Sequence, residues 1–165
     1  MLIRKGFVDR KKIWSFVKNF ENKLNNEKWN GRENNSGRKC LWCGIGVELG
    51  FKCSVFEGEK ISKNLRIRCD DLWGGSDWNS LLLYKYDPGC ELKDHIDRDI
   101  FGNKVVVVNI SIDGLFGGDV EFNYDGRIEI LSNGEVIEFD NKVIHGVRRV
   151  NSERWSLSIR KVLIM

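Results

Sequence analysis

Short apolar runs of strand length, separated by tight-turn sequences, make up most of the chain from residue 40 to its end. The dipeptides Asp125-Gly126 and Asn133-Gly134 lie between such runs and are typical of two-residue β-hairpins. No helical pattern of ten to fifteen residues separates the runs of the second half, so a β-α-β fold is not expected. The pattern therefore predicts a mainly β sandwich, barrel or jelly roll. The predicted strands span residues 41–49, 80–86, 91–97, 104–112, 119–124, 127–132, 135–139, 142–150 and 154–164.

The first forty residues have a different pattern from the strand-rich remainder of the chain. Residues 9–25 are predicted to form a helix that Asp9 caps and that packs through one apolar stripe. The segment 30–39 is rich in Asn, Gly and Ser and is predicted to be a loop. Gly117-Gly118 is predicted to end another loop. A length of 165 residues suits a single domain over 1–165. We expect residues 1–78 to form a helix and a basic lid-like region, and residues 79–165 to form the core. The apolar stripe consists of Ile13, Phe16, Val17, Phe20 and Leu24.

Composition sets wide bounds on the class of protein. Apolar residues make up 41% and charged residues 31%, which indicates a globular chain rather than a disordered one. No apolar run is long enough to cross a membrane, and the charged start is unlike a secretion signal. A cytoplasmic location and reduced cysteines are therefore expected. The pair Cys40-x-x-Cys43 is either half of a zinc site or two buried apolar thiols.

Charge is divided unevenly along the chain. Residues 1–78 carry 16 basic and 10 acidic side chains, whereas residues 79–165 carry 11 and 14. The basic half could face a polyanion such as nucleic acid, or it could be an ordinary solvated surface.

The two histidines are the main candidates for metal ligands. If residues 91–97 are extended, His95 and Asp97 project from the same face of the strand. His145 is the only other histidine that could complete a site. Two histidines and one carboxylate that leave positions open are the ligand set of non-haem Fe(II) oxygenases, although zinc accepts the same ligands. The alternative is a hydrogen-bonded His-Asp pair on a surface strand.

A row of polar side chains follows His145. In a strand over 154–160, Arg154, Ser156, Ser158 and Arg160 would share one face. Burying such a row is costly unless an anion pairs with it. A dicarboxylate fits this requirement, because one end can chelate a metal while an arginine holds the other.

The residues His95-Ile96-Asp97, His145 and Arg154 resemble the motif of 2-oxoglutarate- and Fe(II)-dependent dioxygenases over about residues 80–163. Within that superfamily the chain looks most like the AlkB family of nucleic-acid demethylases. The matching stretches are Tyr84-Lys85-Tyr86-Asp87-Pro88-Gly89, His95-Ile96-Asp97-Arg98-Asp99 and Arg154-Trp155-Ser156-Leu157-Ser158-Ile159-Arg160. Tyr84 and Ser156 replace the asparagines that are usual in that family.

The resemblance implies a double-stranded β-helix, or jelly roll, with the N-terminal helix packed on it. It also implies that Fe(II) is held by His95, Asp97 and His145, with 2-oxoglutarate and O2 as cosubstrates. Tyr86, Arg154 and Arg160 would bind 2-oxoglutarate, and Ser156 resembles the serine of an Arg-x-Ser clamp found elsewhere in the superfamily. Asp99 would lie near a base, and Tyr84 is a further candidate for substrate contact.

The implied function is oxidative demethylation of N-alkylated bases in single-stranded or damaged DNA or RNA. The basic half would then hold phosphates, and a tryptophan could stack on a base. Hydroxylation of a protein side chain is the alternative, because His145-Gly146-Val147 and the run GGDVEF at 117–122 look like prolyl hydroxylases. A small-molecule oxygenase and a non-catalytic cupin-like module also remain open. The basic residues are Arg32, Arg38, Lys39, Arg66 and Arg68, and the tryptophans are Trp42, Trp73 and Trp78.

Overall fold

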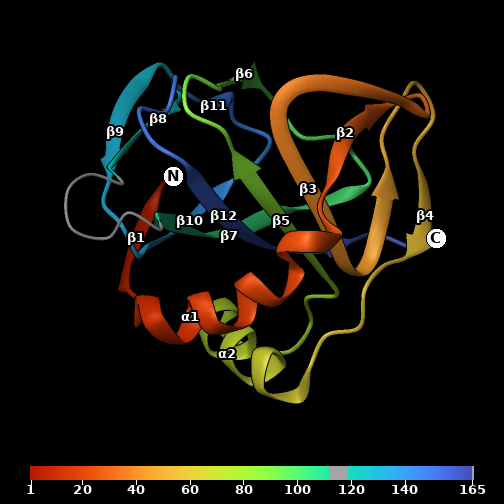
Figure 1. Ribbon diagram of the computed structural model, residues 1–165, viewed down its shortest axis with the longest axis horizontal. Coiled ribbons are helices and arrows are strands. Elements are labelled where there is room, and N and C mark those ends of the chain that lie inside the picture. The colour runs from red at the N-terminus through yellow and green to blue at the C-terminus, as the bar shows by residue number, and fades with distance from the viewer. Residues whose placement is uncertain (112–118, 165) are drawn as a thin grey trace.

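A computed structural model of the chain describes residues 1–111 and 119–164, and its elements are shown in Figure 1. Twelve strands and two α-helices account for most of these residues. The elements of the first half are β1 (Ile3–Phe7), α1 (Arg10–Val17), the 3-10 helix η1 (Lys18–Lys23), β2 (Asn25–Trp29), β3 (Arg32–Glu48), β4 (Ser54–Glu57), α2 (Lys63–Trp73) and β5 (Ser80–Tyr86). Those of the second half are β6 (Leu92–His95), β7 (Phe101–Ser111), β8 (Val120–Tyr124), β9 (Arg127–Leu131), β10 (Glu135–Asp140), β11 (His145–Val147) and β12 (Arg154–Val162).

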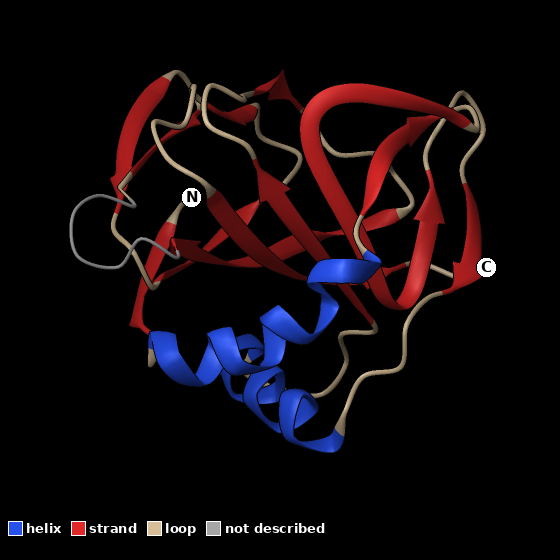
Figure 2. Cartoon of the chain, viewed as in Figure 1, coloured by secondary structure: helices blue, strands red, loops and turns tan. Residues whose placement is uncertain are grey.

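The strands form two antiparallel sheets. The larger has the order β1-β10-β7-β12-β5-β3-β2, with β4 also paired to β3, and the smaller has the order β6-β11-β8-β9. Both helices lie together on one side of the larger sheet, and the smaller sheet lies toward its other side (Figure 2). The predicted mainly β fold with a helix packed on it is therefore confirmed.

Alternation along β12 places apolar side chains under the helices and polar ones on the opposite face. Trp155, Leu157 and Ile159 belong to the core that also includes residues of α1 and α2. Arg154 and Ser156 are almost completely buried on the other face. β12 lies at the centre of the sheet, between β5 and β7, so its polar face is enclosed rather than solvated.

The predicted helix over 9–25 is only partly correct. Asp9 caps α1 as expected, because its side chain accepts hydrogen bonds from the backbone N–H groups of Lys11 and Lys12. The α-helix ends at Val17, and a 3-10 segment continues to Lys23. The stripe still packs against the core, as the apolar periodicity predicted. Asn25 and Asn26 pair with β3 instead of extending the helix.

Two expectations for the first half were wrong. Residues 32–39 are not a loop but the start of the 17-residue strand β3. Asn30 and Gly31 have positive φ values of 51° and 75° and form the β2–β3 hairpin turn. The helix α2 was not predicted from the sequence. Its signals were Ser62, whose side chain caps it, and the buried face Leu65, Cys69 and Trp73 at helical spacing.

The hairpin turns of the second half are confirmed. Asp125 and Gly126 both have positive φ, and Gly134 has φ 83° in the turn between β9 and β10. Gly117-Gly118 lies outside the described residues. β6 and β11 are shorter than the predicted strands, and Asp97 lies two residues past the end of β6. No helix among the described residues is long and apolar enough to cross a membrane.

Candidate metal centre and cosubstrate cavity

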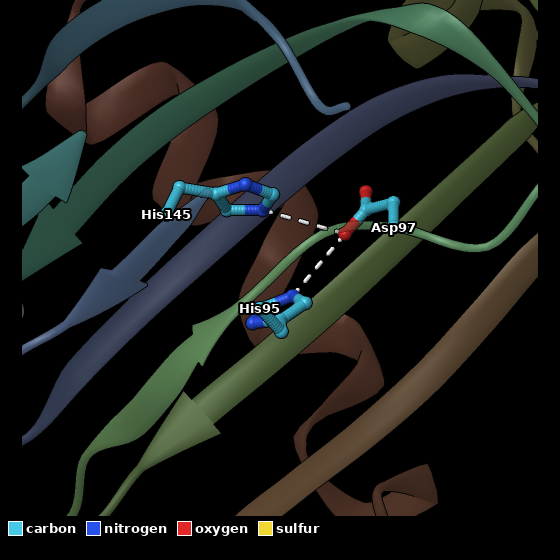
Figure 3. Close-up of side chains that lie close together, drawn as sticks. All are labelled: His95, Asp97 and His145. Atoms are coloured by element: carbon cyan, nitrogen blue, oxygen red, sulfur yellow. Dashed lines mark ion pairs between the residues drawn. The ribbon is translucent and has the colours of Figure 1, made fainter. Parts of the chain in front are cut away.

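Three side chains from separate elements meet at the smaller sheet (Figure 3). His95 ends β6, His145 begins β11, and the two residues are direct cross-strand partners. Asp97 lies in the loop after β6, and its Oδ1 is 3.2 Å from His95 Nε2 and 3.3 Å from His145 Nε2. One ligand atom from each residue lies within 4.8 Å of the others. Among the described residues, this is the only cluster of His, Cys, Asp and Glu with metal-ligand spacing.

The backbone orients both imidazole rings in the same way. His95 Nδ1 lies 2.8 Å from the carbonyl oxygen of Lys93, and His145 Nδ1 lies 2.8 Å from that of Val143. A carbonyl can only accept, so each Nδ1 donates and each Nε2 is left with a lone pair. The rings of Phe122 and Phe139 pack around His145 and hold it in place.

Asp97 is held from both sides. Arg160 Nη1 forms an ion pair with Oδ2, so Oδ1 is the oxygen that faces the histidines. Burial acts to raise the pKa of Asp97, but the charge of Arg160 and its hydrogen bond to the carboxylate hold this pKa below its usual value. The backbone of Asp97 is fixed because its N–H donates to the carbonyl of Asn141, and Lys142 Nζ donates to its carbonyl. The carboxylate is therefore ionised and immobile.

The donor set fits a divalent cation. Ligands about 2.1 Å from one metal at right angles are about 3 Å apart, close to the two distances from Asp97 Oδ1. The lone pairs of the two imidazole Nε2 atoms face a negatively charged carboxylate oxygen, and this arrangement is repulsive unless a cation lies between the three atoms. Two histidines and one carboxylate on one side of a metal leave positions open, which is typical of non-haem Fe(II) sites rather than closed structural zinc sites.

A cavity of about 360 Å³ opens beside the three residues. Arg154 is 4% exposed in its wall, and its Nε donates to Asn109 Oδ1 at 2.7 Å. Its guanidinium carbon lies 4.9 Å from the centre of the Tyr86 ring. Within residues 1–111 and 119–164, Arg154 forms no salt bridge with a carboxylate, and burial lowers its pKa. A buried guanidinium without an anionic partner is costly, so this cavity is suited to an anion.

The structure brings together most of the residues that sequence reasoning selected. Tyr86, Arg154, Ser156 and Arg160, the four predicted cosubstrate residues, all line this cavity, as do Tyr84 and Ser158. Asp99 does not line it and is exposed in the turn after Asp97. Trp42 lines the cavity, whereas Trp73 and Trp78 belong to the core beneath the helices.

The basic residues of the first half do not gather at the cavity. Arg66 and Arg68 lie on α2, at the helix-covered face of the large sheet, and Arg66 stacks over Trp78. Arg38 binds both carboxylate oxygens of Glu27. Arg32 and Lys39 are exposed on β3 and do not line the cavity.

Several residues that shape the site were not identified from the sequence. Asn109 was detectable, because it is a polar residue with a large side chain in the apolar, buried run of β7. Lys142 and Arg98 gave no signal, since their partners are backbone carbonyls that only the fold brings near. Arg98 donates hydrogen bonds to the carbonyls of Gly50 and Phe51. These bonds connect the loop after β6, which carries Asp97, to the segment after β3. Trp29, which is 45% exposed, forms part of the cavity wall beside Phe51.

A second cavity of about 530 Å³ adjoins the first. The two share Trp42, Leu49 and Tyr84 as walls. The second cavity lies between β2, β3, β4 and the segment after β4, and its charged lining is mixed. Its acidic residues are Glu27, Glu48, Glu57 and Glu59, and its basic ones are Lys28 and Lys60. Cys40 also lines it, and all five cysteines are free thiols.

The sequence matches no protein-family model and no curated protein. Solved structures do match. The structure of OsALKBH1 is similar with a TM-score of 0.71 at 14% identity, covering 98% of this chain and 97% of that one. A prolyl-4-hydroxylase from Pseudomonas putida is similar with a TM-score of 0.64 at 16% identity, over 97% of this chain and 92% of that one.

A third similar structure is a prolyl hydroxylase from Trichoplax adhaerens, in complex with a peptide fragment of the oxygen degradation domain of hypoxia inducible factor. It has a TM-score of 0.65 at 12% identity and covers 98% of this chain and 82% of that one. At these identities the likeness concerns the fold. The chain therefore has the fold of these structures over nearly its whole length, whereas its motifs predicted the likeness over about residues 80–163.

Proposed function

We propose that the protein is an Fe(II)- and 2-oxoglutarate-dependent dioxygenase. The observation that carries the proposal is the pairing of two sites around one cavity. His95, Asp97 and His145 converge on one point, and Arg154 lies buried in the wall of the same cavity without a carboxylate partner among the described residues. A metal-chelating dicarboxylate accounts for both features at once.

Each residue has a defined task in this proposal. His95, Asp97 and His145 would hold Fe(II), and Arg160 would keep the second oxygen of Asp97 away from the metal. Arg154 would bind the distal carboxylate of 2-oxoglutarate, with Tyr86 and Ser156 beside it. When bound, Fe(II) would supply the redox chemistry that couples oxidation of 2-oxoglutarate by O2 to oxidation of a substrate C–H bond. The products are succinate, CO2 and the hydroxylated substrate, which together account for both oxygen atoms of O2.

We further propose an N-methyl group on a nucleic-acid base as the oxidised carbon. Hydroxylation of such a group yields formaldehyde and the free base nitrogen. The resemblance of the motifs to the AlkB family and the similarity to OsALKBH1 support this substrate class. Trp29 lines the cavity and offers apolar surface for a planar ligand, and its ring lies 6.1 Å from that of the exposed Phe51. An extruded base is most accessible in a single strand.

A protein side chain is the second candidate. The adjoining cavity supports it, because its mixed charged lining gives a phosphate backbone no continuous basic surface. The two similar prolyl hydroxylases support the same alternative. An extended peptide could place one residue at the metal centre and its neighbours in the adjoining cavity.

The test is an aerobic incubation with Fe(II), 2-oxoglutarate and a methylated single-stranded oligonucleotide, followed by mass spectrometry. We expect succinate together with loss of the methyl mass, and neither product with the variant His145→Ala. Succinate without demethylation would retain the oxygenase and direct the search to peptides. Absence of succinate from metal-loaded protein that binds 2-oxoglutarate would overturn the enzyme assignment.

A further inference from the structure

The strand that carries the first histidine is held by very little backbone pairing. β6 has four residues and, among the described strands, pairs only with β11, which has three. The pairing is also irregular, since His95 faces His145 while Leu92 faces Val147. Gly146 alone therefore faces two residues, Lys93 and Asp94, which makes a β-bulge beside the metal ligands.

The bulge directly orients His95. The carbonyl that accepts from His95 Nδ1 belongs to Lys93, which is one of the two bulge residues. That hydrogen bond sets which ring nitrogen carries the proton and leaves Nε2 facing Asp97. The position of the bulge thus decides the tautomer of the ligand.

A side-chain bridge spans this region. Asn123 of β8 is the direct cross-strand partner of Gly146 and is 3% exposed. Its Nδ2 donates to Asp94 Oδ2 at 2.8 Å, on the far side of β11. The bridge therefore passes over Gly146 and connects β8 to β6 across the intervening strand.

Gly146 is what makes room for this bridge. A Cβ placed on Gly146 would lie 2.4 Å from Asp94 Oδ1 and 2.7 Å from the carbonyl oxygen of Leu92. Any larger residue would displace the Asp94 side chain or the bulge itself. Asp94 also forms a long, exposed ion pair with Arg148 at 3.8 Å, which water and salt weaken.

We propose that Asn123 and Asp94 are positioning residues that lock the β6 bulge over Gly146 and thereby hold His95 in its metal-binding tautomer. The inference rests on the proposed metal centre, but it concerns residues that contact neither metal nor substrate. Loss of such outer partners typically weakens metal binding 10- to 100-fold. Asn123→Ala and Asp94→Ala are therefore expected to weaken Co(II) binding by about 10-fold or more.

Two readouts test the proposal. The first is Co(II) affinity by calorimetry, with the Co(II) absorption spectrum as a report on ligand geometry. The second is the tautomer of His95 in the metal-free protein, measured by long-range ¹⁵N–¹H NMR. Wild type should show one Nδ1–H form, and Asn123→Ala a mixture. Asp94→Asn keeps the acceptor oxygen and should preserve both properties. Glu121→Ala, exposed on the same strand β8, is the matched control and should also behave as wild type.

The outcomes separate this inference from the proposed function. Asp94 is exposed, so Asp94→Ala provides the decisive variant if Asn123→Ala does not fold. Unchanged Co(II) affinity and an unchanged His95 tautomer in both alanine variants would overturn the positioning role. If wild type itself bound no Co(II), the metal centre and the proposed function would be wrong, and the proposed role of holding a metal ligand would be wrong with them. The tautomer would then still report whether the bridge orients His95.

Discussion

Arg160 and Asp97 form a buried ion pair that divides the carboxylate of Asp97 between two roles. Oδ2 contacts Nη1 of Arg160, and Oδ1 faces both histidine Nε2 atoms. The two residues are 63 positions apart in the sequence. Arg160 lies in β12 of the larger sheet, and Asp97 lies in the loop after β6. The arginine lies at the end of the polar row of β12, so the same row both lines the cavity and orients a candidate metal ligand.

The ion pair makes stability depend on pH in a defined direction. The pKa of Asp97 is lower in the folded protein than in the unfolded chain, where it is about 3.9. The ionised carboxylate therefore contributes to the free energy of unfolding above about pH 3.9, and this contribution is lost progressively as the pH falls below that value. In metal-free protein, Asp97→Asn should lower the free energy of unfolding by about 3 kcal/mol at pH 6, because it leaves Arg160 buried without an anion. The difference should shrink by about 2 kcal/mol at pH 2.5. Urea unfolding in the presence of a chelator measures both values, and a pH-independent difference would contradict the assignment.

Arg154 should govern affinity for 2-oxoglutarate rather than folding alone. Arg154→Met removes the charge and should raise the KM for 2-oxoglutarate by about 10- to 100-fold, since a hydrogen bond to a charged group contributes about 1.5–3 kcal/mol. Arg154→Lys should recover only part of this, because lysine lacks the planar fork. Succinate production against 2-oxoglutarate concentration gives KM. Arg127→Met, an exposed arginine on β9, is the control. Equal KM values for Arg154→Met and wild type would exclude the carboxylate-binding role.

The cysteines should behave as buried thiols rather than as a zinc site. Burial raises the pKa of Cys43 and of Cys69 to about 12, and that of Cys40 to about 11. At pH 7.5 these three remain protonated and should react slowly with iodoacetamide in the native protein. All five should react once the chain is unfolded in guanidinium. Peptide mass spectrometry after brief labelling locates the modified thiols. Rapid native labelling of Cys43 would show that the segment opens.

Oligonucleotide binding should depend on residues beside the cavities and not on α2. Arg68→Glu changes an exposed residue on the helix-covered face and should leave affinity for a single-stranded oligonucleotide within about twofold. Lys28→Glu changes a residue that lines the adjoining cavity and should weaken binding and flatten its salt dependence. Fluorescence anisotropy at two salt concentrations makes the comparison. If neither variant alters binding, and binding is insensitive to salt, a peptide becomes the favoured substrate.

The sequence alone determined the strand-rich class, the hairpin turns of the second half and the residues of the candidate centre. These features depend on local rules, such as positive φ at Asp125-Gly126 and alternation along β12. Local rules failed where tertiary pairing overrode composition. The Asn-rich segment 32–39 became strand because β2 and β5 supply its hydrogen-bond partners. A polar segment with no apolar alternation gives no sign of such partners.

Only the tertiary structure decided how the site is assembled. His95 and Asp97 do not meet as neighbours on one strand, because β6 ends at His95 and the loop carries Asp97 back toward His145. The partners that hold them are the carbonyls of Lys93, Val143 and Asn141 and the side chains of Arg160 and Asn123. Every residue has a backbone carbonyl, so the sequence does not mark which carbonyls accept these hydrogen bonds. Contacts between distant strands depend on the strand register. The sequence therefore specified the candidate ligands, and the fold decided their geometry.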